Sequence, residues 1–357
     1  MAIYIFQLVF ILTVSFVVNS RAEYEQESKR KRILLISFFF MWCVCALKKE
    51  TVGIDIPGYK RIYEEAAYWP WFLFSKVYYE QGYTVLIQLF SKAGIPFQVF
   101  NVFVYTVIYV PWYLFFKRYA KQPTMSLLIY LCYQFWILNM SALRQGMAMS
   151  ICLLAFMLLE KKRLGNILGF TALVLLASTI HKSAWIFFIA LGIYVFAVNG
   201  KTLVAFLITF AVCIIFRTNI VTIINSFAGR YQVPQKMTLG GSFLLLCVFT
   251  AFAFITIAVT KRDIQKTNAF DIDNASTYMM LCAIALNLVL NGSSILRASA
   301  FASMFVTISF PNSLTKCTEK SRVVVDLALI VFLIGLYFTD VLLPNQFEIV
   351  PYRFFWQ

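Results

Sequence analysis

The sequence predicts an all-α, polytopic integral membrane protein. Hydrophobic residues make up 61% of the 357 residues, and charged residues only 13%. Average soluble chains are nearer half apolar and one quarter charged, so the apolar excess of this chain has to be solvated by lipid. About twelve apolar runs, within a range of ten to fourteen, are long enough to cross or nearly cross a membrane core that needs roughly 20 helical residues.

The first apolar run covers residues 2–18 and is followed, not preceded, by a basic cluster in "SRAEYEQESKRKR". A cleaved signal peptide has the reverse order, so we expect a membrane span with its N-terminus outside and residues 21–32 in the cytoplasm. The later runs occur at residues 33–47, 96–116, 124–139, 145–159, 164–180, 183–198, 202–216, 241–260, 275–291, 294–310 and 323–341.

If successive spans cross the membrane in alternating directions from this outside N-terminus, the sequence predicts which loops lie in the cytoplasm. The inner loops then hold 18 Lys and Arg residues and the outer segments 12, which is the bias expected of short cytoplasmic loops. This assignment of inner and outer loops requires that the apolar stretch 83–90 does not cross the membrane. It is too short to span, so we predict a re-entrant or interfacial helix near 82–94. The chain 1–357 is then one transmembrane domain with larger periplasmic loops at 48–82 and 217–240.

The charge and cysteine patterns exclude two other classes of site. The net charge of +15 comes from short clusters between apolar runs, which topology explains better than a nucleic-acid surface. The eight cysteines form no CxxC pair and have no histidine at metal spacing, so we interpret them as small buried hydrophobic residues. We expect no bound nucleic acid and no metal.

Two arginines are predicted at the outer starts of inward-running helices. Arg144 lies in "NMSALRQGMAMS" and Arg297 in "NGSSILRASAF". A cation at a helix N-terminus opposes the helix dipole, so this placement needs an anionic partner. Helix N–H groups and the planar guanidinium group both bind phosphate well. We therefore predict a diphosphate-binding site, the cradle, formed by Arg144, Arg297 and these helix N-termini. The alternative is that both arginines snorkel to the lipid headgroups.

Three further outer segments carry candidate residues. In "TVGIDIPGYKRIYEEA", turn residues surround Asp55 beside tyrosines, which suits a sugar site, although Asp55 could also serve only as a helix cap. His181, the single histidine, lies between two apolar runs and is either a functional group or a hydrogen-bonded structural residue. Arg353 in "PYRFFWQ" either joins the cradle or snorkels within an aromatic belt.

The ordered set of motifs resembles the EpsG and Wzy-type polysaccharide polymerases of bacteria. The motifs are "VGIDIPGYKRIYEEA", "YEQGYTVLIQLFSKAGIPFQVF", "SALRQGMAMSICLLAF", "HKSAWIFFIALGIY", "SSILRASAFASMF" and "VPYRFFW". They cover residues 50–310 and the C-terminal tail. The resemblance implies a GT-C-like, metal-independent glycosyltransferase of the bacterial inner (cytoplasmic) membrane, with its active site facing the periplasm and no cofactor.

The resemblance also implies the substrates. They are a donor and an acceptor glycan, both linked to undecaprenyl diphosphate, which the enzyme joins into O-antigen, capsule or exopolysaccharide. Membrane lipids surround the protein, and a separate chain-length regulator protein is an expected partner. The rival functions are a lipid-linked oligosaccharide flippase, an O-antigen ligase and a membrane O-acyltransferase.

The family's motifs match this chain residue by residue. Its Gly-x-Asp turn matches Gly53 and Asp55, its Arg-Gln pair matches Arg144 and Gln145, and its His-x-Ser-Ala motif begins at His181. Displacement of a diphosphate builds negative charge that arginines stabilise, and the acceptor hydroxyl needs a general base. We expect Asp55 or His181 to be that base. The diphosphate ligands are then Arg144, Arg297 and Arg353, and the other substrate contacts are Gln145, Tyr59, Lys60 and Arg230.

Overall fold

Helices form every regular element in the part of the chain that the structure describes. The structure is a computed structural model, and it describes residues 1–357 except 23, 72–78, 134, 229–240, 261–269 and 291–293. The first half contains α1 (Ala2–Ser20), α2 (Gln26–Ala46), α3 (Ile56–Ala66), α4 (Gln81–Lys92), α5 (Phe97–Tyr119), α6 (Pro123–Cys132), α7 (Phe135–Ser141), α8 (Leu143–Leu158) and α9 (Leu164–Ile180). The second half contains η1 (Lys182–Tyr194), α10 (Gly200–Ile215), α11 (Arg217–Ala228), α12 (Gly241–Thr260), α13 (Ile272–Leu290), η3 (Ser294–Ser299), α14 (Ala300–Ser303), α15 (Val306–Leu314), α16 (Glu319–Leu336) and η4 (Tyr337–Leu342).

Helix length does not support the predicted count of about twelve spans. Among the described residues, five helices are long and apolar enough to cross a membrane, or six if α10 and the start of α11, bent by 72°, count as one. Several predicted runs are shorter or broken in the structure. The run 124–139 divides into α6 and α7, and the run 294–310 divides into η3, α14 and α15. Apolar composition alone does not reveal such breaks, because turns inside a membrane protein can be built from apolar residues.

Apolar side chains cover the outside of the bundle. In the most apolar window of α16 only 11% of residues are buried. Val324 on this helix is 67% exposed and Val331 is 72% exposed. A surface of this kind is stable only against lipid, because soluble proteins rarely expose large continuous apolar patches. The chain is therefore a multi-pass helical membrane protein, as its composition predicts.

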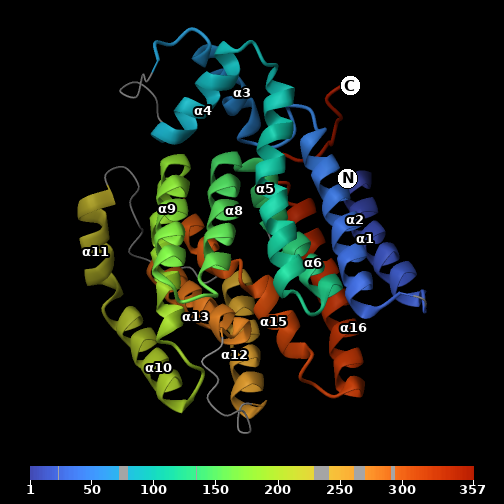
Figure 1. Ribbon diagram of the computed structural model, residues 1–357, viewed down its shortest axis with the longest axis vertical. Coiled ribbons are helices and arrows are strands. Elements are labelled where there is room, and N and C mark those ends of the chain that lie inside the picture. Colours follow the sequence, from blue (N-terminus) through green and yellow to red (C-terminus); the bar gives the residue numbers. More distant parts are fainter. Residues whose placement is uncertain (23, 72–78, 134, 229–240, 261–269, 291–293) are drawn as a thin grey trace.

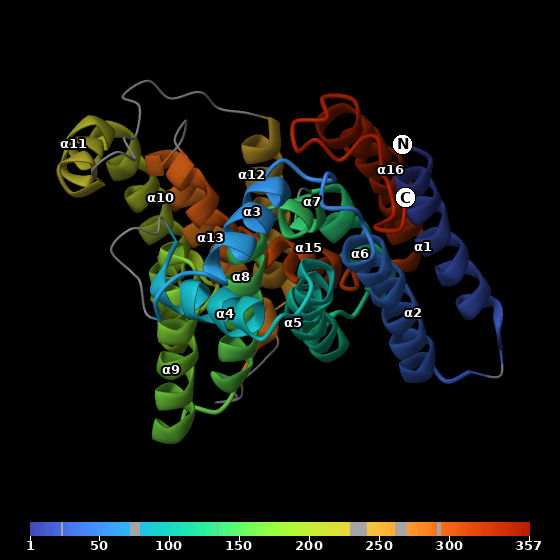
Figure 2. The same ribbon diagram turned by 90° about the horizontal axis from the view of Figure 1, so that it is seen from above.

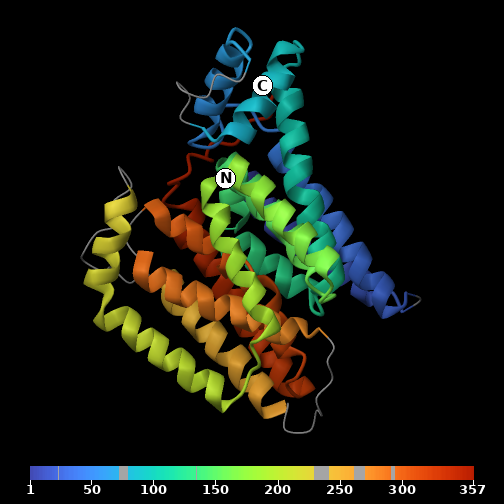
Figure 3. The same ribbon diagram turned by 60° about the vertical axis from the view of Figure 1, so that its left-hand side comes forward.

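The interior of the bundle is formed by α5, α6, α8, α13 and α15. Every residue from Met125 to Cys132 in α6 is buried, and α8 packs between α5 and α9 (Figure 2). Successive long segments run in alternating directions (Figures 1 and 3). We call the end of the bundle at which α3 and α4 lie the α3–α4 end. We call the opposite end, at which α6 and α16 begin, the α6–α16 end. The described parts of the loops that we predicted inside, including 24–25 and 315–318, lie at the α6–α16 end (Figure 1).

Residues 47–96 make no net crossing of the bundle, because α2 ends and α5 begins at the same end (Figure 1). The predicted re-entrant or interfacial segment forms α4, whose 12 residues are too few to span a membrane. The predicted loop 48–82 contains α3 and packs against the C-terminal tail. Backbone hydrogen bonds join Lys49 N to Arg353 O at 2.9 Å and Ile54 N to Phe347 O at 2.8 Å. The predicted loop 217–240 begins with α11, and its residues 229–240 lie outside the described residues.

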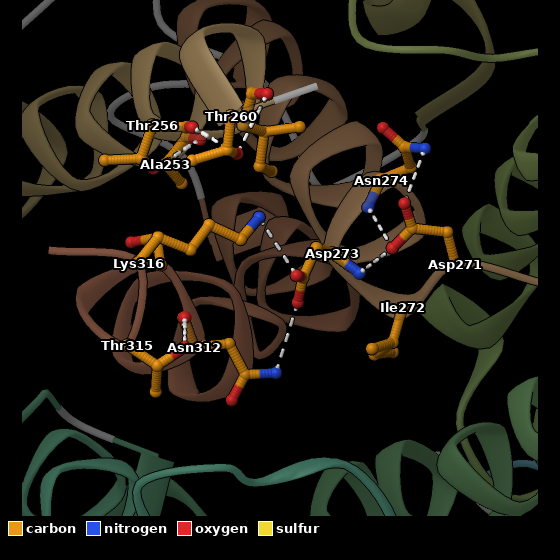
Figure 4. A network of polar contacts seen from close by, with 12 residues as sticks. Ala253, Thr256, Thr260, Asp271, Ile272, Asp273, Asn274, Asn312, Thr315 and Lys316 are labelled. Carbon is orange, nitrogen blue, oxygen red and sulfur yellow. Dashed lines mark hydrogen bonds and ion pairs between the residues drawn. The ribbon is translucent and has the colours of Figure 1, made fainter. Parts of the chain in front are cut away.

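A polar network ties helices together at the α6–α16 end (Figure 4). The buried carboxylate of Asp273 accepts from Lys121 Nζ at 3.1 Å and from Lys316 Nζ at 3.0 Å. With Asp271 it forms an Asp-x-Asp pair, which was not among the residues predicted from the sequence. Asp271 accepts from the backbone N–H of Asp273 at 2.9 Å, and so caps α13. The pair therefore anchors the α13 N-terminus and two lysines.

Candidate functional site

The carboxylate of Glu80 joins three helices at the α3–α4 end. Glu80 precedes α4, which lies across the ends of α8 and α9 (Figure 1). Its Oε2 accepts a hydrogen bond from Arg144 Nη1, at the start of α8. Its Oε1 accepts from the backbone N–H of Lys182 at 3.0 Å and lies 3.5 Å from Nδ1 of His181, the residue that ends α9. One carboxylate therefore holds an arginine, a histidine and a helix N-terminus together.

The surroundings of Glu80 keep it ionised. Its side chain is only 10% exposed, and burial by itself raises the pKa of the carboxyl. The contact with His181, the charge of Arg144 and the Lys182 N–H outweigh burial and lower the pKa of Glu80 to about 2. The sequence requires an anionic partner for Arg144 at the helix start, and within the protein Glu80 is that partner.

Three tyrosines surround the Arg144 side chain on the α3 and α4 side. The rings of Tyr59, Tyr79 and Tyr83 pack with centroids 5.4 to 5.8 Å apart. The Arg144 guanidinium carbon lies 4.2 Å from the centre of the Tyr79 ring. The Arg144 Nε and the Tyr83 hydroxyl are buried and have no hydrogen-bond partner in the described part of the chain. The guanidinium is thus held in place while some of its donors stay unused.

Gln145 brings the second arginine segment to the same place. Its Nε2 donates to the backbone oxygen of Arg297 at 2.7 Å, and Gln145 is only 3% exposed. The ring of His181 lies parallel to that of Phe301, with centroids 6.4 Å apart. The segment 297–301 therefore borders the Glu80 site. The backbone of Arg297 lies beside the Arg144–Gln145 pair, while the Arg297 side chain is exposed.

Asp55 lies on the tyrosine side of the site. It is the residue before α3, but its carboxylate forms no helix-cap hydrogen bond. Burial raises the pKa of Tyr79 to about 12, and the negative charge of Asp55 contributes to this rise. The backbone N–H of Tyr59 donates to the backbone oxygen of Asp55 at 3.1 Å, and the Tyr59 ring packs against Tyr79, so Asp55 begins the turn of α3 that faces this side of the site. The structure places Asp55 at the edge of the same site, away from the Glu80 carboxylate itself.

The remaining predicted residues lie outside this group. Lys60 pairs with Glu50 at 3.1 Å and with Glu64 at 3.7 Å, and no contact joins its side chain to Glu80 or Arg144 in the described residues. Arg353 has an exposed side chain, and only its backbone is fixed, through Lys49. Arg230 lies outside the described residues.

Glu80 is the residue that the sequence analysis missed. The stretch "YEQGY" lies within a motif of the resemblance, but we interpreted the segment only as a membrane-surface helix. A signal was available, because Arg144 requires an anionic partner and Glu80 is one of the five acidic residues in the predicted outer loop 48–82. Two residues on, Gly82 lets α4 approach α9. A Cβ atom there would lie 2.9 Å from the backbone oxygen of Thr179.

In the described residues, no three His, Cys, Asp or Glu side chains gather as a metal site requires, and all eight cysteines are free. The comparison with curated proteins and with solved structures finds no match. The comparison with protein families finds that the EpsG family model matches residues 31–354, which include every part of the site described above. On a match over nearly its whole length, the chain belongs to the EpsG family.

Proposed function

We propose that the chain is a polysaccharide polymerase of the bacterial inner membrane. It transfers a growing glycan from one undecaprenyl diphosphate carrier to a repeat unit on another, at the periplasmic face and without metal or cofactor. A GT-C-like arrangement of about twelve crossing segments, several of them short, accompanies this activity. Membership of the EpsG family and the alternating direction of the segments support the proposal. A chain-length regulator is the proposed protein partner.

The observation that carries this proposal is the grouping of Arg144 and His181 on one carboxylate, Glu80. Cleavage of the donor leaves negative charge on the departing diphosphate. The Glu80 carboxylate accepts one hydrogen bond from Arg144, and a guanidinium has five donors, so donors remain for phosphate oxygens. We propose that Arg144, the N-terminus of α8 and the nearby Arg297 stabilise that charge. Arg353, Gln145, Lys60 and Arg230 are proposed as further diphosphate and substrate contacts.

We propose His181 as the general base for the acceptor hydroxyl. Its Nδ1 faces Glu80, so the carboxylate can fix the ring and leave Nε2 for the substrate. Asp55 lies beside Tyr79 and Tyr59 at the edge of the site, where a carboxylate and aromatic rings suit a sugar. We therefore assign Asp55 to the binding of sugar hydroxyls, although both residues were equal candidates on sequence grounds.

A flippase is the main rival from another class, and it would need charged groups at mid-membrane depth. Among the described residues, the charged side chains that are buried belong to Lys48, Arg217 and Asp273, and each lies at or just beyond a helix end. Lys48 and Asp273 lie at opposite ends of the bundle and Arg217 lies at the bend between α10 and α11, so buried charge by itself does not separate the two functions. An O-antigen ligase shares the donor chemistry and differs in its acceptor.

The test compares a deletion strain with strains that express single variants. Loss of the gene should reduce the lipid-linked glycan from a ladder to one repeat unit on the periplasmic side. Single repeats trapped on the cytoplasmic side would establish a flippase. A full ladder that is never transferred to lipid A core would establish a ligase. His181→Gln should abolish the ladder, and Asp55→Asn should weaken it; the reverse order would make Asp55 the base.

A further inference from the structure

A cavity of about 630 Å³ opens at the α6–α16 end, opposite the Glu80 site. The starts of α2, α6 and α16 form its walls. Four cationic side chains line it against two carboxylates, Glu27 and Asp326. The cations come from three separate segments of the chain and are Lys29, Arg30, Lys121 and Arg322. The cavity therefore carries an excess of positive charge.

Two of the four cationic side chains, Arg30 and Lys121, are already paired with carboxylates of the protein. Arg30 donates to Glu27 through Nε at 3.0 Å and Nη2 at 2.9 Å, and its Nη1 donates to the Ala120 oxygen at 3.1 Å. Lys121 pairs with Asp273, outside the cavity. These contacts fix the walls and leave the other two cations as the groups that are available to a ligand.

No carboxylate in the described part of the chain forms an ion pair with Lys29 or Arg322. Lys29 Nζ donates to the backbone oxygen of Asn19 at 3.1 Å, which leaves its charge uncompensated. The Arg322 side chain makes no ion pair or hydrogen bond to any described residue, and the nearby carboxylate of Asp326, one turn further along α16, feels its charge. An Asp326 carboxylate oxygen is also buried without a hydrogen-bond partner among the described residues.

The start of α6 adds donors to the same cavity. Gln122 precedes this helix and provides no side-chain cap, and Pro123 is its first residue. The backbone N–H groups of Thr124 and Met125 therefore lack partners within the helix, and both residues line the cavity. Free N–H groups at the positive end of a helix dipole bind phosphate well.

Both helical walls change from polar to apolar toward the middle of the bundle. On α16, Arg322, Asp326 and Ile330 follow at four-residue spacing and share one face over about 12 Å. On α2, Lys29 lies one turn before Ile33, and both line the cavity. A free anion would use only the charged mouth. A membrane lipid has the same order of chemistry as these walls, with a charged head followed by an apolar chain.

We propose that this cavity binds the phosphodiester headgroup of an anionic phospholipid, through Arg322, Lys29 and the α6 N-terminus. The lipid's acyl chain lies against Ile33 and Ile330. Basic pockets between membrane helices bind anionic lipid headgroups by this combination of charge and apolar contact. The bound lipid joins α2 to α16, two helices that are far apart in the sequence. This site is separate from the proposed glycosyl-transfer site.

The experiment is native mass spectrometry of the full-length detergent-purified protein, titrated with cardiolipin or with phosphatidylcholine. We expect tighter binding of cardiolipin. Arg322→Gln should lower the cardiolipin affinity about fivefold, and the double variant with Lys29→Gln should lower it further. Lys320→Gln is the matched control, because it removes the same charge from an exposed position on α16 that does not line the cavity.

Three results would overturn the proposal. They are equal binding of both lipids, an unchanged cardiolipin affinity in Arg322→Gln, and an equal loss in the Lys320→Gln control. Inorganic phosphate that displaces cardiolipin at similar concentrations would show a site for free phosphate instead. Gel filtration checks that each variant is folded. If the double variant is not folded, the comparison of Arg322→Gln with Lys320→Gln still decides the proposal.

Discussion

The carboxylate of Glu80 accepts a hydrogen bond from the guanidinium of Arg144, 64 residues further along the chain. Both side chains are largely buried, with 10% and 20% of their surface exposed. Because His181 and the Lys182 N–H contact the same carboxylate, this pair sets the relative positions of α4, α8 and α9. The geometry of the proposed site thus depends on one acidic residue that is not itself expected to touch the reacting atoms.

Replacing Glu80 by Gln should inactivate the protein and lower its stability. The change leaves Arg144 buried without a counter-charge, which costs roughly 3 kcal/mol when a buried pair loses one partner. It also frees the His181 ring. We expect loss of the glycan ladder in the complemented deletion strain and a lower melting temperature of the purified protein.

Glu64→Gln is the control for this variant. Glu64 lies on α3 with a side chain that is 61% exposed, and it contacts Lys60 at 3.7 Å. Exposed pairs of this kind contribute little to stability. A Glu80→Gln protein with a normal ladder would show that the carboxylate does not organise the site.

Replacing Arg144 by Lys keeps the charge and removes the planar fork. Lysine cannot contact Glu80, stack on Tyr79 and still offer paired donors to a diphosphate. We expect the amount of polymerised glycan to fall by about tenfold or more. The amount of Arg144→Lys protein in the same membranes should stay normal. Arg61→Lys is the control, because Arg61 is 75% exposed and lies 3.9 Å from Glu65. A normal ladder in Arg144→Lys would leave only a structural role for this arginine.

The sequence was sufficient to predict the class of the protein and the end of the bundle at which Arg144 and His181 lie. Both predictions rest on features that are local in sequence: apolar runs, and basic loops that mark alternate ends. The turn around Asp55 was visible for the same reason, because Gly53 and Pro57 interrupt the pattern. Such features need no knowledge of which segments pack together.

Features that depend on packing could not be predicted. Glu80 meets Arg144 only because α4 folds over α8, and no spacing within either segment encodes that contact. The contact of Lys60 with Glu50 was hidden for the same reason, whereas its i,i+4 contact with Glu64 is local in sequence. Glu50 lies ten residues before Lys60, in the turn between α2 and α3. The break between α6 and α7 falls inside an apolar run, so hydropathy joins two helices that the structure separates.

Gly82 provides a test of the α4 position that leaves every polar group in place. In Gly82→Ala, the new methyl group would lie 2.9 Å from the backbone oxygen of Thr179, so α4 has to move away from α9. Glu80 moves with α4, and we expect reduced activity with a smaller loss of stability than in Glu80→Gln. The ladder assay and thermal unfolding measure the two effects.

Gly58→Ala is the matched control. Gly58 lies within α3, and a Cβ atom there meets nothing within 4 Å. Alanine in an exposed helix is more favourable than glycine by up to about 1 kcal/mol, so this variant should be as stable as the parent or slightly more stable. Equal losses in Gly58→Ala and Gly82→Ala would argue against a specific contact between α4 and α9.

Lys48 should make the stability of the protein depend on pH in the neutral to alkaline range. The residue lies just beyond α2, is fully buried, and donates to the backbone oxygen of Val52 in the turn that leads to Asp55. Burial lowers the pKa of Lys48 from 10.5 to about 7. Between these values the unfolded chain binds a proton that the folded chain does not. The free energy of unfolding should therefore rise from pH 7 toward pH 10, by an amount on the order of 3 kcal/mol.

Lys48→Met isolates this effect, because methionine fills similar space and carries no charge. The variant should unfold at a higher temperature than the parent at pH 7, and its unfolding should lose the rise between pH 7 and pH 10. Lys49→Met is the control: Lys49 donates to Gln357 O at 2.9 Å near the surface, so this variant should keep the parental dependence. The measurement is thermal unfolding in detergent, followed by tryptophan fluorescence across this range. A parental slope in Lys48→Met would mean that Lys48 stays charged in the folded protein, with its charge compensated by solvent or by a bound anion near the Asp55 turn.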